Sequence, residues 1–340
     1  MSVGARLRAL RSAGRVDESA STDRVVALAE RLAVLLAAGV SAPIAWRQLA
    51  SDDAAEPATR AAAVAAEEGE PVAAAIRRAT RNDDPGRPGR GCGARRGRPP
   101  AEAGATGAWA AVAAAWEVAN ATGAPLALSL RELAAALRDD AHLRREVRAA
   151  LAGPKASARL VTALPAIAVV LGLAMGFDTV GILFGNPLGW ACLAVGGGLL
   201  WAGARWNRAL AARAAPPSAS PGLEFDLLAI AMSSGASLDA ATEVTRRAMR
   251  EHLPSASDAG ADIAATVRLA SEAGAPIAEL LRSEAARRRR TARTDGATRA
   301  AALGVRLMLP LGACILPAFV LLGVAPLMIS VVTGTLGGAS

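Results

Sequence analysis

The sequence has few of the residue types that catalytic and metal sites use most. It contains no tyrosine, 3% aromatic residues, two histidines and three cysteines among 340 residues. Cys92, Cys192 and Cys314 lie far apart with no CxxC motif or Cys/His cluster, so neither a disulfide framework nor a zinc site is indicated. His142 and His252 each stand alone in a charged helical stretch, which favours solvated positions. The sequence predicts no metal and no cofactor.

Negative charge and aromatic stacking groups are also scarce relative to arginine. The net charge is +8, and Lys155 is the single lysine. A basic chain can bind nucleic acid, but the near absence of aromatic side chains argues against that partner. Glu67, Glu68 and Glu70 cluster after an apolar helix without a nucleophile or an acid/base partner. We therefore predict that the protein is not an enzyme and has no catalytic residue.

Long uncharged runs are the strongest pattern that the sequence does have. Residues 160–177, 179–204 and 307–340 contain no charged side chain. A helix needs about 20 apolar residues to cross a bilayer. The pattern predicts an all-α membrane protein in which three transmembrane helices accompany antiparallel helical-bundle modules.

Arginines flank these runs on one side only. They precede the first run, follow the second and precede the third, whereas Asp178 is the only charge between the first two. The positive-inside rule then predicts a multi-pass protein of the inner (cytoplasmic) membrane, with a cytoplasmic N-terminus and the C-terminus outside. Trp190 and Trp206 bracket the second run, as interfacial aromatics do.

The apolar runs contain prolines and glycines but no ionisable group. Pro165, Pro310 and Pro317 are candidate kinks, and Gly196-Gly197-Gly198 is a candidate for close helix contact. A membrane subunit of a transporter is the alternative function. It would need a polar pathway between the spans, for which intramembrane charges are the usual sign.

An internal repeat organises the remainder of the chain. VANATGAPLALSLR at 118–131 and LASEAGAPIAELLR at 269–282 share seven of fourteen positions, 151 residues apart. A second correspondence relates residues 24–40 to residues 224–248 and matches Leu32 with Leu228, Gly39 with Gly235 and Ser41 with Ser237. Each copy therefore contains two predicted αα-hairpins. In the first copy Asp23 is a candidate helix N-cap, and Gly69-Glu70-Pro71 marks one further turn.

Each predicted hairpin turns at a glycine that is followed by a residue typical of a helix start. These structural turn residues are Gly39, Ser41, Gly123, Pro125, Gly235, Ser237, Gly274 and Pro276. Charged residues on the hairpins, namely Arg131, Glu132, Arg138 and Asp139, are candidates for contact with a partner. The first copy also holds a Gly-, Pro- and Arg-rich insertion that is too polar to bury a core.

The predicted organisation follows from these features. It consists of a disordered basic N-terminus (1–21), a first cytoplasmic module (22–155, with a disordered insertion at 81–107), two transmembrane helices joined by a short outer loop (156–206), a shortened second module (207–301), a third transmembrane helix (302–332) and an outer tail (333–340).

The stretches LAVLLAAGVSAPIAWRQLA and ATGAPLALSLREL, together with this order of modules and spans, resemble the F-type inner-membrane platform proteins of type II secretion and type IV pilus systems. The basic flank RREVRAALAGPKASARLVTALP looks most like the Tad (Flp) pilus subunits TadB and TadC. The resemblance covers about residues 22–335 and is better in the first copy. It implies a non-catalytic platform that couples a secretion ATPase to pilin-like subunits, beside a partner platform subunit or a second copy of itself.

Overall fold

The computed structural model describes residues 21–52, 55–81, 100–174, 187–213, 220–254, 259–306, 308–325 and 328. Every regular element over these ranges is a helix, as the sequence predicted. The predicted basic N-terminus, outer loop and outer tail lie almost entirely outside the described residues. The chain divides into two compact units, one of Met1–Arg145 with Pro217–Arg293 and one of Glu146–Pro216 with Thr294–Ser340.

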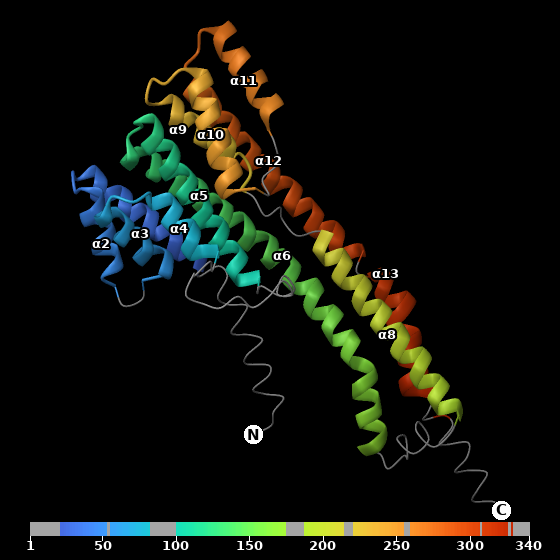
Figure 1. Ribbon diagram of the computed structural model, residues 1–340. Helices are drawn as coiled ribbons and strands as arrows, with labels where there is room; N and C mark the ends of the chain where they lie inside the picture. The colour runs from blue at the N-terminus through green and yellow to red at the C-terminus, as the bar shows by residue number, and fades with distance from the viewer. Residues whose placement is uncertain are drawn as a thin grey trace, which may run out of the picture. The chain divides into compact units, whose positions relative to one another are not determined.

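The helices of the first unit reproduce the internal repeat (Figure 1). The first copy comprises a helix over residues 21–37, α2 (Ala42–Ala50), α3 (Pro57–Glu68), α4 (Val72–Arg81), α5 (Pro100–Thr122) and the start of α6 (Leu126–Ala174). The second comprises α9 (Leu223–Met232), α10 (Leu238–His252), α11 (Gly260–Ala273) and the start of α12 (Ile277–Arg306). By the repeat, α9, α10, α11 and α12 correspond to the helix at 21–37, α2, α5 and α6. The second copy goes from α10 to α11 through residues 253–259, where the first copy has α3 and α4.

The two copies form one body with a common hydrophobic core. Helix α5 packs against both α9 and α10, while α2, α3, α4 and α5 pack in succession. Buried residues from both copies, among them Leu32, Trp46, Leu130, Leu228 and Leu281, belong to one cluster. The sequence pattern predicted two separate modules, one for each copy. Alanine contributes little apolar area, so each copy gains stability by burying its apolar face against the other.

The hairpin glycines adopt the left-handed backbone conformation. Gly39, Gly123, Gly235 and Gly274 have φ values of 83°, 73°, 81° and 65°. The bonds at each turn are local, such as the one from the Ala124 N–H to the Ala119 carbonyl. Left-handed glycine ends a helix because it adds no Cβ strain.

The residues that follow these glycines start the next helices in different ways. Ser237 accepts a hydrogen bond from the Ala240 N–H, whereas Ser41 takes the N-cap position without a side-chain bond. Pro125 and Pro276 directly precede α6 and α12. Asp23 is not an N-cap, since it lies inside the first helix.

The insertion of the first copy is shorter than predicted. Helix α5 begins at Pro100, so residues 100–107 are helical where the sequence predicted disorder. Residues 82–99 of that stretch lie outside the described part of the chain. The segment 100–107 is rich in alanine, which favours helix despite its two glycines.

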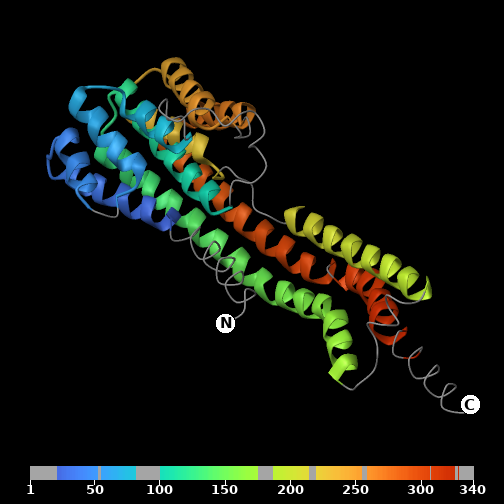
Figure 2. The same cartoon turned by 60° about the horizontal axis from the view of Figure 1, so that its bottom comes forward.

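The second unit contains the apolar helices (Figure 2). Helix α8 (Pro187–Arg213) packs against α13 (Met308–Pro310), the π-helical turn η1 (Leu311–Ile315), α14 (Leu316–Phe319) and a second π-helical turn, η2 (Val320–Val324). A Cβ on Gly196 would lie 2.6 Å from Leu322 Cγ, and one on Gly203 would lie 3.1 Å from Cys314 Cβ. The pairing order makes these segments antiparallel. Gly197 and Gly198, predicted to take part in the contact, would meet nothing within 4 Å.

The three candidate kink prolines lie in different settings. Helix α6 is α-helical through Pro165, Pro310 immediately precedes η1, and Pro317 lies in the short α14 between the two π-helical turns. Proline cannot donate an N–H to the helix ladder, and π-helical turns adjoin the second and third of these sites.

One helical stretch among the described residues, Ile277–Val324, is long and apolar enough to cross a membrane by its length and composition. Its most apolar window is 25% buried, unlike the core helix of a soluble protein. The other two predicted crossings stay predictions.

Two glycines with the same backbone conformation should respond differently to alanine. A Cβ at Gly222 (φ 83°) would lie 2.8 Å from the Ala285 carbonyl oxygen, whereas one at Gly123 would meet nothing within 4 Å. We expect Gly123→Ala to cost about 1 kcal/mol through backbone strain alone, and Gly222→Ala to cost more because the backbone must also shift. Equilibrium denaturation of the two purified variants measures this, and equal losses would contradict the close approach at Gly222.

Candidate functional site

The described residues contain no candidate metal site, because no group of three or more histidine, cysteine or acidic side chains within these ranges could hold a metal ion. One set of charged side chains lies where the two copies of the repeat meet, which we call the inter-copy seam. Its members are Arg77, Glu117, Glu132, Arg247, Glu251, His252 and Arg282.

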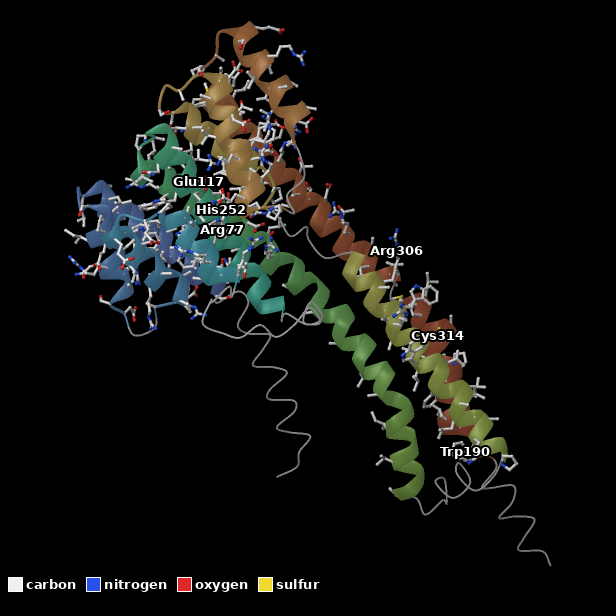
Figure 3. The ribbon with its side chains drawn as sticks, in the orientation of Figure 1. Arg77, Glu117, Trp190, His252, Arg306 and Cys314 are labelled. Carbon is white, nitrogen blue, oxygen red and sulfur yellow. The ribbon has the colours of Figure 1, made fainter. Side chains whose placement is uncertain are left out.

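The central contact of the inter-copy seam joins α5 to α10. His252 Nε2 lies 2.6 Å from a carboxylate oxygen of Glu117, and the histidine is only 8% exposed (Figure 3). The hydrogen bond from His252 lowers the pKa of Glu117, against the effect of burial. The prediction of a solvated His252 is therefore wrong, because α10 packs on α5 and removes this side chain from water. His142 is exposed, as predicted.

Three further ion pairs cross the inter-copy seam. Arg77 on α4 pairs with Glu251 on α10, and Arg282 on α12 pairs with Glu132 on α6 at 3.1 Å. Arg247 on α10 lies 4.0 Å from Glu117. These side chains keep part of their hydration, so each pair adds modestly to stability and acts mainly through its geometry. The inter-copy seam thus fixes the register of one copy on the other.

A second polar contact lies within the second copy. Asp226 on α9 accepts a hydrogen bond from Arg289 on α12 at 2.5 Å, and 12% of the Asp226 side chain is exposed. Burial raises the pKa of Asp226 to about 6, although the positive charge of Arg289 acts in the opposite direction. Loss of hydration therefore outweighs pairing at this carboxyl group.

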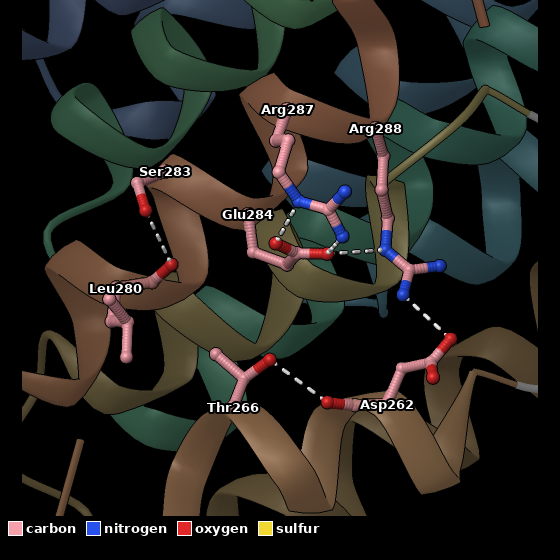
Figure 4. Close-up of polar contacts among 7 residues, drawn as sticks. All are labelled: Asp262, Thr266, Leu280, Ser283, Glu284, Arg287 and Arg288. Atoms are coloured by element: carbon pink, nitrogen blue, oxygen red, sulfur yellow. Dashed lines mark hydrogen bonds and ion pairs between the residues drawn. The ribbon is translucent and has the colours of Figure 1, made fainter. Parts of the chain in front are cut away.

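Helix α11 is attached to α12 by a charged network (Figure 4). Glu284 accepts hydrogen bonds from Arg287 and Arg288, and Arg288 also donates to Asp262 on α11 at 2.6 Å. The guanidinium of Arg288 lies 4.4 Å from the ring centroid of Phe225. These contacts connect three helices of the second copy through one arginine.

The predicted partner-contact residues divide into two classes. Glu132 pairs with Arg282 and Arg138 pairs with Glu30, so both already serve the fold. Arg131 and Asp139 are exposed on α6. The eight turn residues lie at four separate turns and do not form a common site.

The contacts of the inter-copy seam were not predicted from the sequence, although Glu132 was a candidate for contact with a partner. Those of His252 and Arg77 join positions 135 and 174 residues apart, and no local pattern distinguishes Glu117 or His252 from other charged helix residues. The available signal was the repeat itself, because aligned copies often pack as pairs.

The raised pKa of Asp226 predicts a specific dependence of stability on pH. The fold favours the protonated carboxyl group of Asp226 over the ionised one. The contribution of this group to the free energy of unfolding is therefore present below pH 3.8 and is lost as the pH rises through about 6. Asp226→Asn keeps the neutral form. Between pH 4 and pH 7, the unfolding free energy of the variant should increase by about 2 kcal/mol relative to that of the wild-type chain. Denaturation of both proteins across this range measures it, and Glu117 contributes equally to both. A difference that does not vary with pH would contradict the assignment.

Comparison with known proteins gives one match. The family model of type II secretion system (T2SS) protein F, T2SSF, matches residues 197–325. This segment runs from α8 through the whole second copy to the end of η2, whereas the resemblance seen in the sequence was stronger in the first copy. Neither the curated proteins nor the solved structures gave a match. Members of this family are non-catalytic membrane subunits of secretion and pilus systems. Residues 197–325 are therefore similar to a T2SSF domain, the protein F component of the type II secretion system.

Proposed function

We propose that this protein is a non-catalytic inner-membrane platform subunit of a Tad or type IV pilus, or of a type II secretion-like apparatus. It couples a cytoplasmic ATPase to pilin assembly or protein export. The observation that carries the proposal is the T2SSF match over residues 197–325. This range includes the helices of the second copy and also apolar helices of the second unit.

Three membrane crossings suit the surface of the second unit. Large apolar side chains are exposed along its helices, namely Leu160, Ile167, Val170, Val195, Trp201, Met308, Leu309, Leu316 and Val320. Such surfaces are rare on soluble monomers and are the normal surface of helices in lipid. Close contact of Gly196 and Gly203 with the facing helix is typical of packing between membrane helices.

The orientation follows from charge and from interfacial tryptophan. Arg306 lies at one end of the apolar segment and Trp190 at the other, with Cys314 between them (Figure 3). Trp190 is 57% exposed, as an interfacial anchor would be. The arginine end faces the cytoplasm, so both copies of the repeat are cytoplasmic and the C-terminus is outside.

Two helices carry the coupling in this proposal. Helix α6 includes the buried core residues Leu130 and Leu133 and continues into the first apolar run, and α12 includes Leu281 and continues to Arg306. An ATPase that displaces the helical core would therefore pull directly on segments leading to the membrane. The partners are the secretion ATPase, a partner platform subunit or a second copy, and pilin-like subunits, in contact with lipid.

The orientation predicts which positions a membrane-impermeant maleimide reaches. Single-cysteine chains, with the native cysteines replaced by serine, are made as Glu272→Cys on exposed α11 and as Ser340→Cys. In intact cells we expect labelling at position 340 alone, and labelling at both positions after permeabilisation. Labelling at position 272 in intact cells would overturn the proposed topology.

The platform function predicts capture of the ATPase from solubilised membranes by the full-length chain. Reversing the exposed charges with Arg131→Glu and Asp139→Arg should reduce capture severalfold without lowering the melting temperature. Arg31→Glu, at an exposed site on the first helix, serves as the control. Unchanged export after deletion of the gene, together with no ATPase capture, would overturn the function.

A further inference from the structure

The second copy contains a groove between its helices. A cavity of about 980 Å³ lies among α9, α10 and α11, with a floor formed mainly by Leu228, Thr242, Thr245, Ile263 and Val267. Ala264 and Arg268 on α11 also line it and are exposed to solvent. We call this cavity the α10–α11 groove.

The internal repeat explains why the groove is open. Thr242 corresponds to Trp46 in the first copy, and Val267 corresponds to Trp116. Trp46 and Trp116 pack against each other with ring centroids 5.5 Å apart and are almost fully buried. The second copy replaces this pair by two much smaller side chains, so the corresponding space is unfilled.

The first copy also covers this space with two helices. Helices α3 and α4 pack in sequence between α2 and α5, and Ala113 on α5 is fully buried. The residue that corresponds to Ala113 is Ala264, which is exposed, because seven residues (253–259) replace α3 and α4. The α10–α11 groove is thus the position of a missing helix pair.

Two polar features show what the occupant must offer. Thr245 is 3% exposed, lines the groove and has a hydroxyl without a hydrogen-bond partner. Glu243 on the rim corresponds to Arg47, which pairs with Glu67 of α3 at 3.3 Å in the first copy. Glu243 itself already pairs with Arg246 at 3.0 Å and with Arg250 at 3.3 Å, so the rim requires no further basic group.

We propose that the α10–α11 groove binds an antiparallel helix pair from a different polypeptide. The occupant has an alanine-rich face, a bulky apolar side chain that fills the space between Thr242 and Val267, and a polar group that bonds to the Thr245 hydroxyl. A second copy of this chain fits less well, because its α3 and α4 are already packed in its own core. Assignment of the occupant to a partner platform subunit rests on the proposed function.

Hydrogen exchange tests whether the groove accepts such a helix pair. Residues 255–258 of the full chain are replaced by a copy of residues 55–81 carrying Ala62→Trp. We expect amides of α10 and α11 that line the groove to exchange about tenfold more slowly than in a chain with a Gly/Ser insert of equal length. The same graft with Ala62 retained should protect less, because the space between Thr242 and Val267 would stay unfilled. Equal exchange in the graft and the Gly/Ser control would overturn the proposal.

Filling the groove tests whether another chain uses it. Thr242→Trp with Val267→Trp should preserve folding and ATPase capture but reduce export or pilus assembly at least tenfold. The matched control is Ala265→Trp with Leu269→Trp, at exposed positions of α11 that do not line the groove. Normal assembly by the filled variant would overturn the docking site. Failure of the wild-type chain to capture its ATPase would instead overturn the proposed function.

Discussion

The fold depends on burial of small apolar side chains between the two copies of one repeat. Alanine supplies much of the core, and each alanine removes little area from water. A four-helix second copy could not build a large core from such residues alone. Packing α9 and α10 on α5 places both copies in a single core, and the inter-copy seam then fixes their register through Glu117, His252 and the flanking ion pairs.

The two copies differ in length, and their structures differ accordingly. The first copy is closed by α3, α4 and a tryptophan pair, whereas the second leaves the corresponding space open. Because helix pairs recognise each other by shape and by matched charges, an unfilled position in a repeat is a natural place for a partner's helices. The T2SSF match falls on this shorter copy and its apolar helices.

The apolar helices of the second unit are packed differently from the core of the first unit. Glycine permits α8 to approach the facing segment closely, and the prolines there accompany two π-helical turns. Exposed leucine, methionine and tryptophan side chains would be unfavourable in water and are compatible with lipid. The proposed orientation of these helices rests on the arginines that flank them.

The sequence by itself determined the helical class, the hairpin glycines and the apolar runs, because 3.6-residue periodicity, left-handed helix ends and uncharged length are local properties. Helix α5 began before the predicted end of the insertion, since alanine outweighs two glycines there. Only the tertiary structure decided that the copies share a core, that His252 is buried against Glu117, and that a groove lies beside Thr242. These features join residues more than 100 positions apart or depend on a missing neighbour, and neither leaves a local pattern in the chain.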